Sequence, residues 1–392
     1  ATLRSRIERH PRGFYLLCLA VLCERWAAAV LSSSLVFMLC ENYGHSRGEA
    51  LRLCGLYNAA SYFLTLPGGF AIDRILGACR SLSAGMVLLT CGYAALTVPS
   101  PSALWLSAPL LLLGHALFKP SSQVVMALLY ERHDRRLDGA QIAVYLVINI
   151  AVTAGSVCAG LLSGSLDFRA SFTLATAVLL IGTLAVFLGK SVLRLRPKQL
   201  SPRVSAPTPP LALSSRQRVQ RIAALTLAML LFAVGFGQVE GSLLLWARDR
   251  TDRLLLGFEI PAAWFVGLPA LLVLLLAPAQ LALLPRLQQT TTTPRLVAWG
   301  LVAVALAFAV LLPPALFFPG QRVSMLWLLA AMTLLVTGEL LISPLGLSLL
   351  LRLAPPRFVG VVLGVWYVAG ALGCWLAGEL GALFVDQMKP KE

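Results

Sequence analysis

The stretch SVLRLRPKQLSPRVSAPTPPLALSSRQRV, residues 191–219, decides how the rest of the chain is organised. It contains five prolines and many Lys and Arg residues, and it lacks an apolar run long enough to cross a membrane. Such a composition is typical of a flexible tether between folded parts. The sequence therefore predicts a linker that joins an N-terminal bundle, residues 1–190, to a C-terminal bundle, residues 220–392.

Long apolar runs lie on both sides of this linker. The chain has 392 residues, of which 58% are hydrophobic and 12% charged, a balance that soluble domains of this length do not show. Runs that could cross a hydrocarbon layer of roughly 30 Å lie at 13–39, 50–72, 81–99, 103–129, 140–164, 169–189, 222–247, 261–284, 296–319, 323–351 and 358–385. We therefore predict an all-α polytopic membrane protein with about eleven spans, six before the linker and five after it. The last run is too short for two crossings, so a twelfth helix is expected to be missing.

The basic residues indicate the orientation of the chain in the membrane. The formal net charge is +15, and most of the 32 Lys and Arg residues lie in alternate loops and in the linker. Because positive charge is retained on the cytoplasmic side, we expect a cytoplasmic N-terminus and, with eleven spans, an outer C-terminus. We further expect the membrane to be a bacterial inner membrane. No nucleic acid partner is expected, because the positive charge is not gathered on one folded domain.

Five charged residues lie within the predicted spans: Glu24 and Arg25 in the first, Lys119 in the fourth, Glu240 in the seventh and Glu339 in the tenth. A charge that faces lipid costs at least about 2.5–3.5 kcal/mol, so each should face the bundle interior. Glu24 can compensate only one of the two cations near it. We expect the surplus positive charge to bind an anionic group such as a carboxylate, and Glu339 to bind an ammonium group. The alternative that the cluster only fixes helix packing stays open.

Several other residues give weaker signals. Asn149 and Tyr62 could hydrogen-bond a solute or join neighbouring helices. His115 lies one turn before Lys119, and a neutral packing role is favoured over a proton relay. The sequence contains no nucleophile and base set, phosphate-binding loop or metal-ligand spacing, so we expect no enzyme activity, no cofactor and no metal.

A resemblance adds to this interpretation. The stretch GGFAIDRILGACR, residues 68–80, resembles a loop of the major facilitator superfamily in which a Gly-x3-Asp-Arg pattern and a following basic residue clasp the inner face. It implies a conformational gate made of Gly69, Asp73, Arg74 and Arg80.

More narrowly, the chain resembles the proton-coupled oligopeptide transporters. The resemblance runs from about residue 11 to 385, and FKPSSQVVMALLYERHDRRLDGAQIAVYLVINI, residues 118–150, is its most specific part. It implies two bundles that transport a peptide together with a proton. The substrate-binding residues that we predict are Arg25, Tyr62, Lys119, Asn149 and Glu339. The resemblance makes Arg25 and Lys119 partners of the peptide carboxylate and of the proton site. Asn149 becomes a backbone contact, and Glu339 a partner of the amino terminus.

The chain departs from that family at positions that carry protons. The first glutamate of the family motif falls on Val21, and the glutamate of the seventh helix falls on Gly237. A buried carboxylate is needed to carry a proton, because its pKa can be moved toward neutrality. Glu24 and Glu240 are the remaining candidates, so proton coupling is expected to be altered or lost.

Two functions stay open at this point. The first is a secondary transporter for peptide-like or other small zwitterionic or anionic solutes, working by alternating access. The alternative is a non-transporting relative that serves as a scaffold or accessory subunit of a larger membrane complex. In that case the partner proteins would bind the open flank of the C-terminal bundle.

Overall fold

A computed structural model describes residues 10–130, 136–162, 168–193, 214–355 and 358–387. They are almost entirely helical, and two compact units are distinguished. The first unit is drawn from Ala1–Val30, Leu64–Gly155 and Phe168–Pro202, and the second from Leu31–Phe63, Ser156–Asp167 and Arg203–Glu392. Helices α1 and α6 each run from one unit into the other.

The helices before the linker are α1 (Arg12–Glu41), α2 (Arg47–Phe63), α3 (Thr65–Ala71), the π turn η1 (Ile72–Leu76), α4 (Ala78–Leu96), α5 (Pro101–Leu128), α6 (Arg136–Leu162), α7 (Phe168–Leu188) and α8 (Lys190–Leu193). After it come α9 (Ser215–Phe236), the 3-10 turn η4 (Gly237–Glu240), α10 (Ser242–Asp249), α11 (Trp264–Thr290), α12 (Thr293–Ala309), α13 (Leu312–Phe317), α14 (Met325–Leu353) and α15 (Val359–Gln387). The strands have two residues each: β1 (Thr251–Asp252), β2 (Leu254–Leu255), β3 (Phe258–Glu259) and β4 (Val323–Ser324). Strand β1 pairs parallel with β4, and β2 pairs antiparallel with β3.

The prediction of an all-α polytopic membrane protein is confirmed. Among the described residues, ten helical segments are long and apolar enough to cross a membrane. The run expected at 50–72 differs, because it forms the shorter helices α2 and α3 with a break at Leu64. Pro67 explains the break, since it has no N–H to donate to the carbonyl of Phe63 four residues earlier.

The predicted linker is described only at its two ends. Helix α8 precedes the residues that lie outside the described part of the chain, 194–213, and α9 begins after them. The hydroxyl of Ser214 accepts a hydrogen bond from the backbone of Gln217, whose side chain accepts one from the backbone of Ser214. This capping box explains why the helix starts here.

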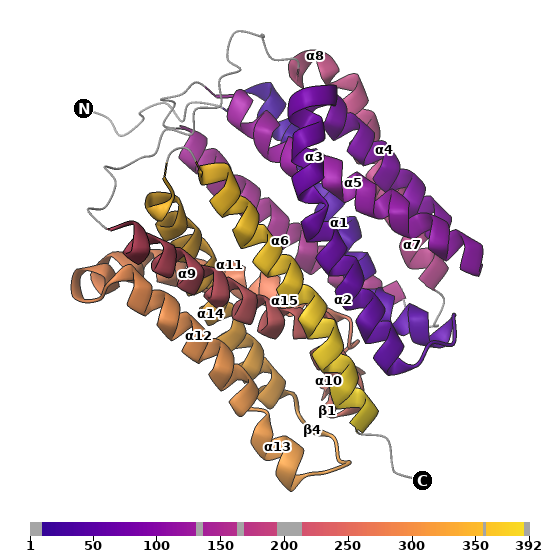
Figure 1. Cartoon of the computed structure of the whole chain (residues 1–392). Helices are drawn as coiled ribbons and strands as arrows, with labels where there is room; N and C mark the ends of the chain where they lie inside the picture. Colours follow the sequence, from indigo (N-terminus) through magenta and orange to yellow (C-terminus); the bar gives the residue numbers. More distant parts are fainter. Residues whose placement is uncertain (1–9, 131–135, 163–167, 194–213, 356–357, 388–392) are drawn as a thin grey trace, which may run out of the picture. The chain divides into compact units, whose positions relative to one another are not determined.

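Close glycine contacts hold the helices of the first unit together. Figure 1 shows α4, α5 and α7 lying side by side. A Cβ atom on Gly85 of α4 would lie 2.9 Å from the backbone nitrogen of Phe118 and 3.0 Å from the carbonyl oxygen of Gly114, both in α5. Small residues let helix backbones approach where lipid provides no hydrophobic driving force.

The second unit contains two further helix crossings at which glycines allow close backbone contact. Helix α2 runs along α15, and a Cβ atom on Gly378 would lie 2.8 Å from the Cα of Gly55. Helix α12 runs along α14, where a Cβ atom on Gly338 would lie 2.8 Å from the carbonyl oxygen of Gly300. Each crossing therefore requires glycine on both helices.

Candidate functional site

The first unit contains a buried charge cluster around Glu24 in α1. The Glu24 side chain is 2% exposed and that of Arg25 is 24% exposed. The guanidinium of Arg25 donates two hydrogen bonds to the Glu24 carboxylate, from Nε and from a terminal nitrogen. Bidentate pairing of this kind is the strongest form that an Arg–carboxylate contact takes.

Helix α5 brings a third titratable group to this pair. His115 is 4% exposed, and its Nδ1 lies 2.9 Å from Oε1 of Glu24. This Nδ1 makes no hydrogen bond of regular geometry with the described residues. Lys119 lies one turn further along α5 and is half-buried. Glu24 and Arg25, two of the charges expected to cluster, therefore form a pair. Lys119 lies one turn beyond His115, which contacts Glu24.

A proline fixes the shape of α5 at this point. Pro120 has no N–H, so the carbonyl of Ala116 lacks its usual helical donor. Gly68 of α3 lies against that carbonyl so closely that a Cβ atom at this glycine would lie 2.0 Å from the oxygen. Such a backbone approach is typical of a Cα–H···O contact. The neighbouring hydroxyl of Ser122 donates to the carbonyl of Lys119 at 2.8 Å.

Asn149 lies in α6 and is 7% exposed. Its side-chain nitrogen donates to the carbonyl of Tyr145 at 2.8 Å, one turn earlier in the same helix. Thr153 donates to the carbonyl of Asn149 at 2.9 Å. This local bonding leaves the side-chain oxygen of Asn149 as the part that could accept a hydrogen bond from a solute.

In the second unit, Glu240 ends the η4 turn and accepts a hydrogen bond of 2.9 Å from the side-chain nitrogen of Asn58 in α2. Both residues line a pocket of about 20 Å³, enough for one water molecule. Gly237 lines the same pocket, and a Cβ atom there would lie 2.7 Å from the Cβ of Ala377 in α15. Position 237 therefore has no room for a side chain.

Glu339 lies half-buried in the middle of α14. Within the described part of the chain it makes no hydrogen bond or ion pair. The next residue, Leu340, has a carbonyl that Pro344 cannot serve, and the side-chain nitrogen of Gln280 in α11 donates to it at 2.5 Å. No local pattern indicates this contact, because Gln280 resembles any other polar residue near the end of a span.

The remaining predicted residues lie in α2, α3, η1 and α4. Tyr62 in α2 is 41% exposed. Gly69 lies in α3, while Asp73, Arg74 and Arg80 are exposed and make no ion pair with the residues that the structure describes. The clasp expected from the resemblance therefore stays a prediction.

Sequence reasoning missed a group of ion pairs in the second unit. Arg47 of α2 contacts Asp249 of α10 at 2.6 Å, Arg248 contacts Glu41 at 2.7 Å, and Arg52 contacts Glu379 of α15 at 3.2 Å. The partners are far apart in the sequence, so only the helix packing reveals them. These pairs tie the ends of α1 and α2 to α10 and α15.

Comparisons by family model, by sequence and by structure all match this chain to transporters. The family model described as Major Facilitator Superfamily matches residues 17–378. The chain is 28% identical to the Peptide transporter YePEPT of Yersinia enterocolitica, over 95% of this chain and 88% of the relative. It is 25% identical to the Uncharacterized transporter YclF of Bacillus subtilis, over 96% and 88%. Among solved structures, a mutant of the peptide transporter POT in complex with alafosfalin has a TM-score of 0.86 at 25% identity, covering 96% of this chain and 90% of that one. These matches confirm the resemblance to the oligopeptide transporters.

Proposed function

Because the chain belongs to the Major Facilitator Superfamily, we propose that it is a secondary transporter of small peptide-like zwitterions that works by alternating access. It is a multi-pass membrane protein whose relatives are peptide transporters. The observation that carries the proposal is the buried cluster of Glu24, Arg25 and His115 in the first unit, followed by Lys119 one turn along α5.

The charge of this cluster favours an anionic partner. Glu24 accepts two hydrogen bonds from Arg25, so the negative charge of Glu24 is compensated within this pair. Lys119 adds a further positive charge one turn along α5, half-buried in the same unit. A positively charged site of this kind attracts an anion such as a solute carboxylate. Arg25 and Lys119 are its proposed contacts, with Asn149 and Tyr62 as proposed hydrogen-bonding residues.

The second unit is proposed to recognise the other end of the solute. Glu339 is half-buried and has no cationic partner among the described residues. An ammonium group would compensate its charge in the same way as a lysine or arginine does elsewhere. This role rests on the chemistry of the residue, and it is tested by substitution.

Altered proton coupling is also proposed, on the packing around Gly237. A carboxylate cannot replace this glycine, because Ala377 occupies the space where a Cβ atom would lie. Glu240, one turn away and bonded to Asn58, is the acidic side chain nearest in sequence that could carry a proton. We further propose a bacterial inner membrane, a cytoplasmic N-terminus and an outer C-terminus.

The proposal is tested by equilibrium binding to the purified protein. A free dipeptide, the same dipeptide with an amidated C-terminus and the same dipeptide with an acetylated N-terminus would be compared by calorimetry. We expect the amidated peptide to bind at least about tenfold more weakly than the free one, since it lacks the carboxylate. Equal affinity of the free and amidated peptides would contradict the assignment of Arg25 and Lys119.

The alternative role as an accessory subunit is favoured by two positions. Val21 is 5% exposed in an apolar environment and Gly237 has no room for a side chain, so neither can serve proton transfer. Gentle isolation from native membranes, followed by mass spectrometry, distinguishes the roles. A stoichiometric set of other subunits would support the alternative, whereas a solitary protein would support transport.

A further inference from the structure

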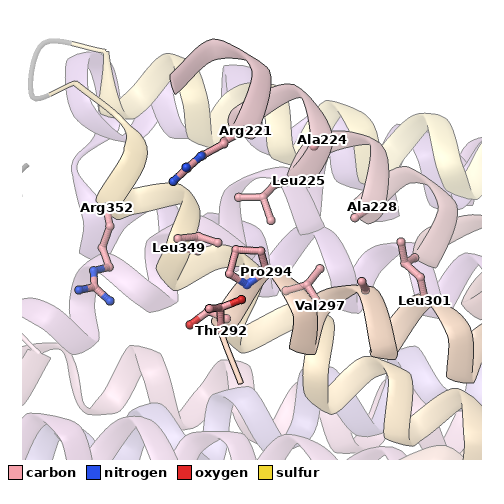
Figure 2. A pocket seen from close by; sticks show the side chains of 12 residues that line it. Arg221, Ala224, Leu225, Ala228, Thr292, Pro294, Val297, Leu301, Leu349 and Arg352 are labelled. Atoms are coloured by element: carbon pink, nitrogen blue, oxygen red, sulfur yellow. The ribbon is translucent and has the colours of Figure 1, made fainter. Parts of the chain in front are cut away.

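The second unit contains a pocket that the proposed transport function does not use. It has a volume of about 630 Å³, within the range of roughly 300–1,000 Å³ that is typical of ligand sites. Helices α9, α12 and α14 form its walls (Figure 2). All three helices begin or end beside it, at Ser215, Thr293 and Leu353, so it lies at the level where this bundle leaves the hydrocarbon.

The two ends of the pocket differ in chemistry. Figure 2 shows Arg221 of α9 and Arg352 of α14 at one end, and Leu301 of α12 at the other. Leu225 and Val297 are buried and form the apolar wall between them. A pocket with a positively charged end and an apolar wall leading away from it matches a ligand with an anionic headgroup and a hydrocarbon tail.

Within the part of the chain that the structure describes, no acidic side chain pairs with these arginines. The lining contains no Asp or Glu, and neither Arg221 nor Arg352 forms an ion pair with any described residue. The sequence extends this observation, because no Asp or Glu occurs between residues 203 and 239, 260 and 338, or 340 and 378. Arg221 and Arg352 are both exposed and carry positive charge at this end of the pocket, which favours an anionic group there.

Further donors lie beside the arginines. Thr292 and Thr293 also line the pocket, and α12 begins between them. The hydroxyl of Thr292 makes no hydrogen bond with any described residue, so its O–H can donate to a ligand. Phosphate oxygens accept hydrogen bonds from guanidinium groups and hydroxyls together.

We propose that this pocket binds an anionic glycerophospholipid, with its phosphate between Arg221 and Arg352 and one acyl chain along Leu225, Val297 and Leu301. Basic pockets between membrane helices are suited to anionic headgroups. The acyl chain explains the apolar wall, which a free phosphate ion would leave unused. The inference does not depend on whether the protein transports peptides.

The test is native mass spectrometry of the full chain in detergent. The protein is first incubated either with anionic palmitoyl-oleoyl phosphatidylglycerol or with zwitterionic palmitoyl-oleoyl phosphatidylethanolamine. We expect the wild type to retain phosphatidylglycerol in preference to phosphatidylethanolamine. In the double variant Arg221→Gln/Arg352→Gln, the ratio of bound phosphatidylglycerol to bound phosphatidylethanolamine should fall by at least about tenfold. The control Arg295→Gln removes an exposed charge next to the pocket that does not line it, and it should retain the preference.

A second variant keeps the inference falsifiable if the double variant fails to fold. Ala298→Trp fills the pocket from an exposed position on α12 and should lower lipid retention without a change of charge. An unchanged preference for phosphatidylglycerol in the double variant, or unchanged lipid retention in Ala298→Trp, would overturn the inference. Displacement of the lipid by millimolar inorganic phosphate would also overturn it, because the site would then recognise phosphate alone.

Discussion

At the scale of single residues, the buried pair of Glu24 and Arg25 is the central feature of the first unit. Removing one member of a buried ion pair costs more than removing both, because the remaining charge stays unpaired in an apolar environment. Glu24 is 2% exposed, whereas Arg25 is 24% exposed and can reach water more easily. The two single substitutions should therefore differ in their cost.

We expect Arg25→Gln to lower the free energy of unfolding by about 3 kcal/mol, since it leaves the Glu24 charge buried. Glu24→Gln should cost less, and the double variant Glu24→Gln/Arg25→Gln should recover part of the loss. Unfolding by a denaturing detergent measures all three against Arg80→Gln, an exposed residue of the same unit. Additive effects of the two single substitutions would contradict coupling within the pair.

Lys119 carries the second residue-scale prediction. Lys119→Ala should lower the affinity for a dipeptide by at least about tenfold, because one positive charge opposite the carboxylate is lost. The matched control is Lys190→Ala, which removes a lysine whose ammonium lies over the Phe187 ring, 3.7 Å from its centroid. Calorimetry would give both affinities, and thermal unfolding would show that both variants are folded. Equal affinities of the two variants would remove Lys119 from the site.

At the scale of helices, proline and glycine pairs decide how the spans bend and approach one another. Pro120 and Pro344 each leave a carbonyl without its helical donor, and a neighbouring helix covers the carbonyl in each case. Gly68 does so for Ala116, and Gln280 does so for Leu340. Prolines are tolerated within membrane helices for this reason.

This explanation predicts that Gln280 and Pro344 are coupled. Gln280→Leu should lower the free energy of unfolding by about 1–3 kcal/mol, since the Leu340 carbonyl is then left without a donor. In a Pro344→Ala background the helix supplies its own N–H, so Gln280→Leu should cost much less. A double-mutant cycle from denaturing-detergent titrations measures the difference. A cost of Gln280→Leu that is the same in both backgrounds would show that the contact has another role.

The crossing of α2 and α15 gives a second prediction at this scale. Gly378→Ala should destabilise the protein by about 1–3 kcal/mol, because the added Cβ atom would lie 2.8 Å from the Cα of Gly55 and from the carbonyl oxygen of Leu51. Gly360→Ala in the same helix is the control, since a Cβ atom there meets nothing within 4 Å. Thermal unfolding of both variants decides the point. A drop in Tm of the same size for Gly360→Ala would indicate a general effect of alanine in α15.

At the scale of the whole molecule, transport by alternating access requires helices that are in contact to separate. In the second unit, α2 and α15 are joined by the Gly55–Gly378 crossing and by the pair of Arg52 and Glu379. These contacts belong to one of the states that a transporter visits. A permanent link between the two helices should then stop the cycle.

A cross-link tests this requirement. In a background without the eight native cysteines, Arg52→Cys/Glu379→Cys would be treated with a bifunctional thiol reagent after reconstitution into liposomes. Uptake should fall to background, whereas the single variant Arg52→Cys should keep its uptake under the same treatment. Full uptake in the cross-linked protein would mean that α2 and α15 stay together during transport.

How much of this could be predicted from the sequence depends on the range of the interaction. The linker and the apolar runs predicted the helical membrane fold, because length and hydrophobicity act locally. The break at Leu64 was missed, since a single proline outweighed an otherwise continuous apolar run. The intramembrane charges pointed to Glu24 and Arg25, since such charges are costly unless paired. The contact of Gln280 with Leu340 could not be predicted, because it depends on how α11 packs against α14, and local sequence patterns do not specify that packing.

Counterflow of a labelled dipeptide in liposomes that contain the purified protein distinguishes a transporter from a non-transporting relative. Liposomes loaded with unlabelled dipeptide should accumulate the labelled one without any pH gradient, because exchange requires a functional site and alternating access but no coupling. Liposomes with the Lys119→Ala variant should accumulate much less at the same dipeptide concentration, because the variant binds the dipeptide more weakly. If the wild type behaves like empty liposomes while a characterised peptide transporter exchanges the same dipeptide in parallel, the protein is not a transporter of such solutes.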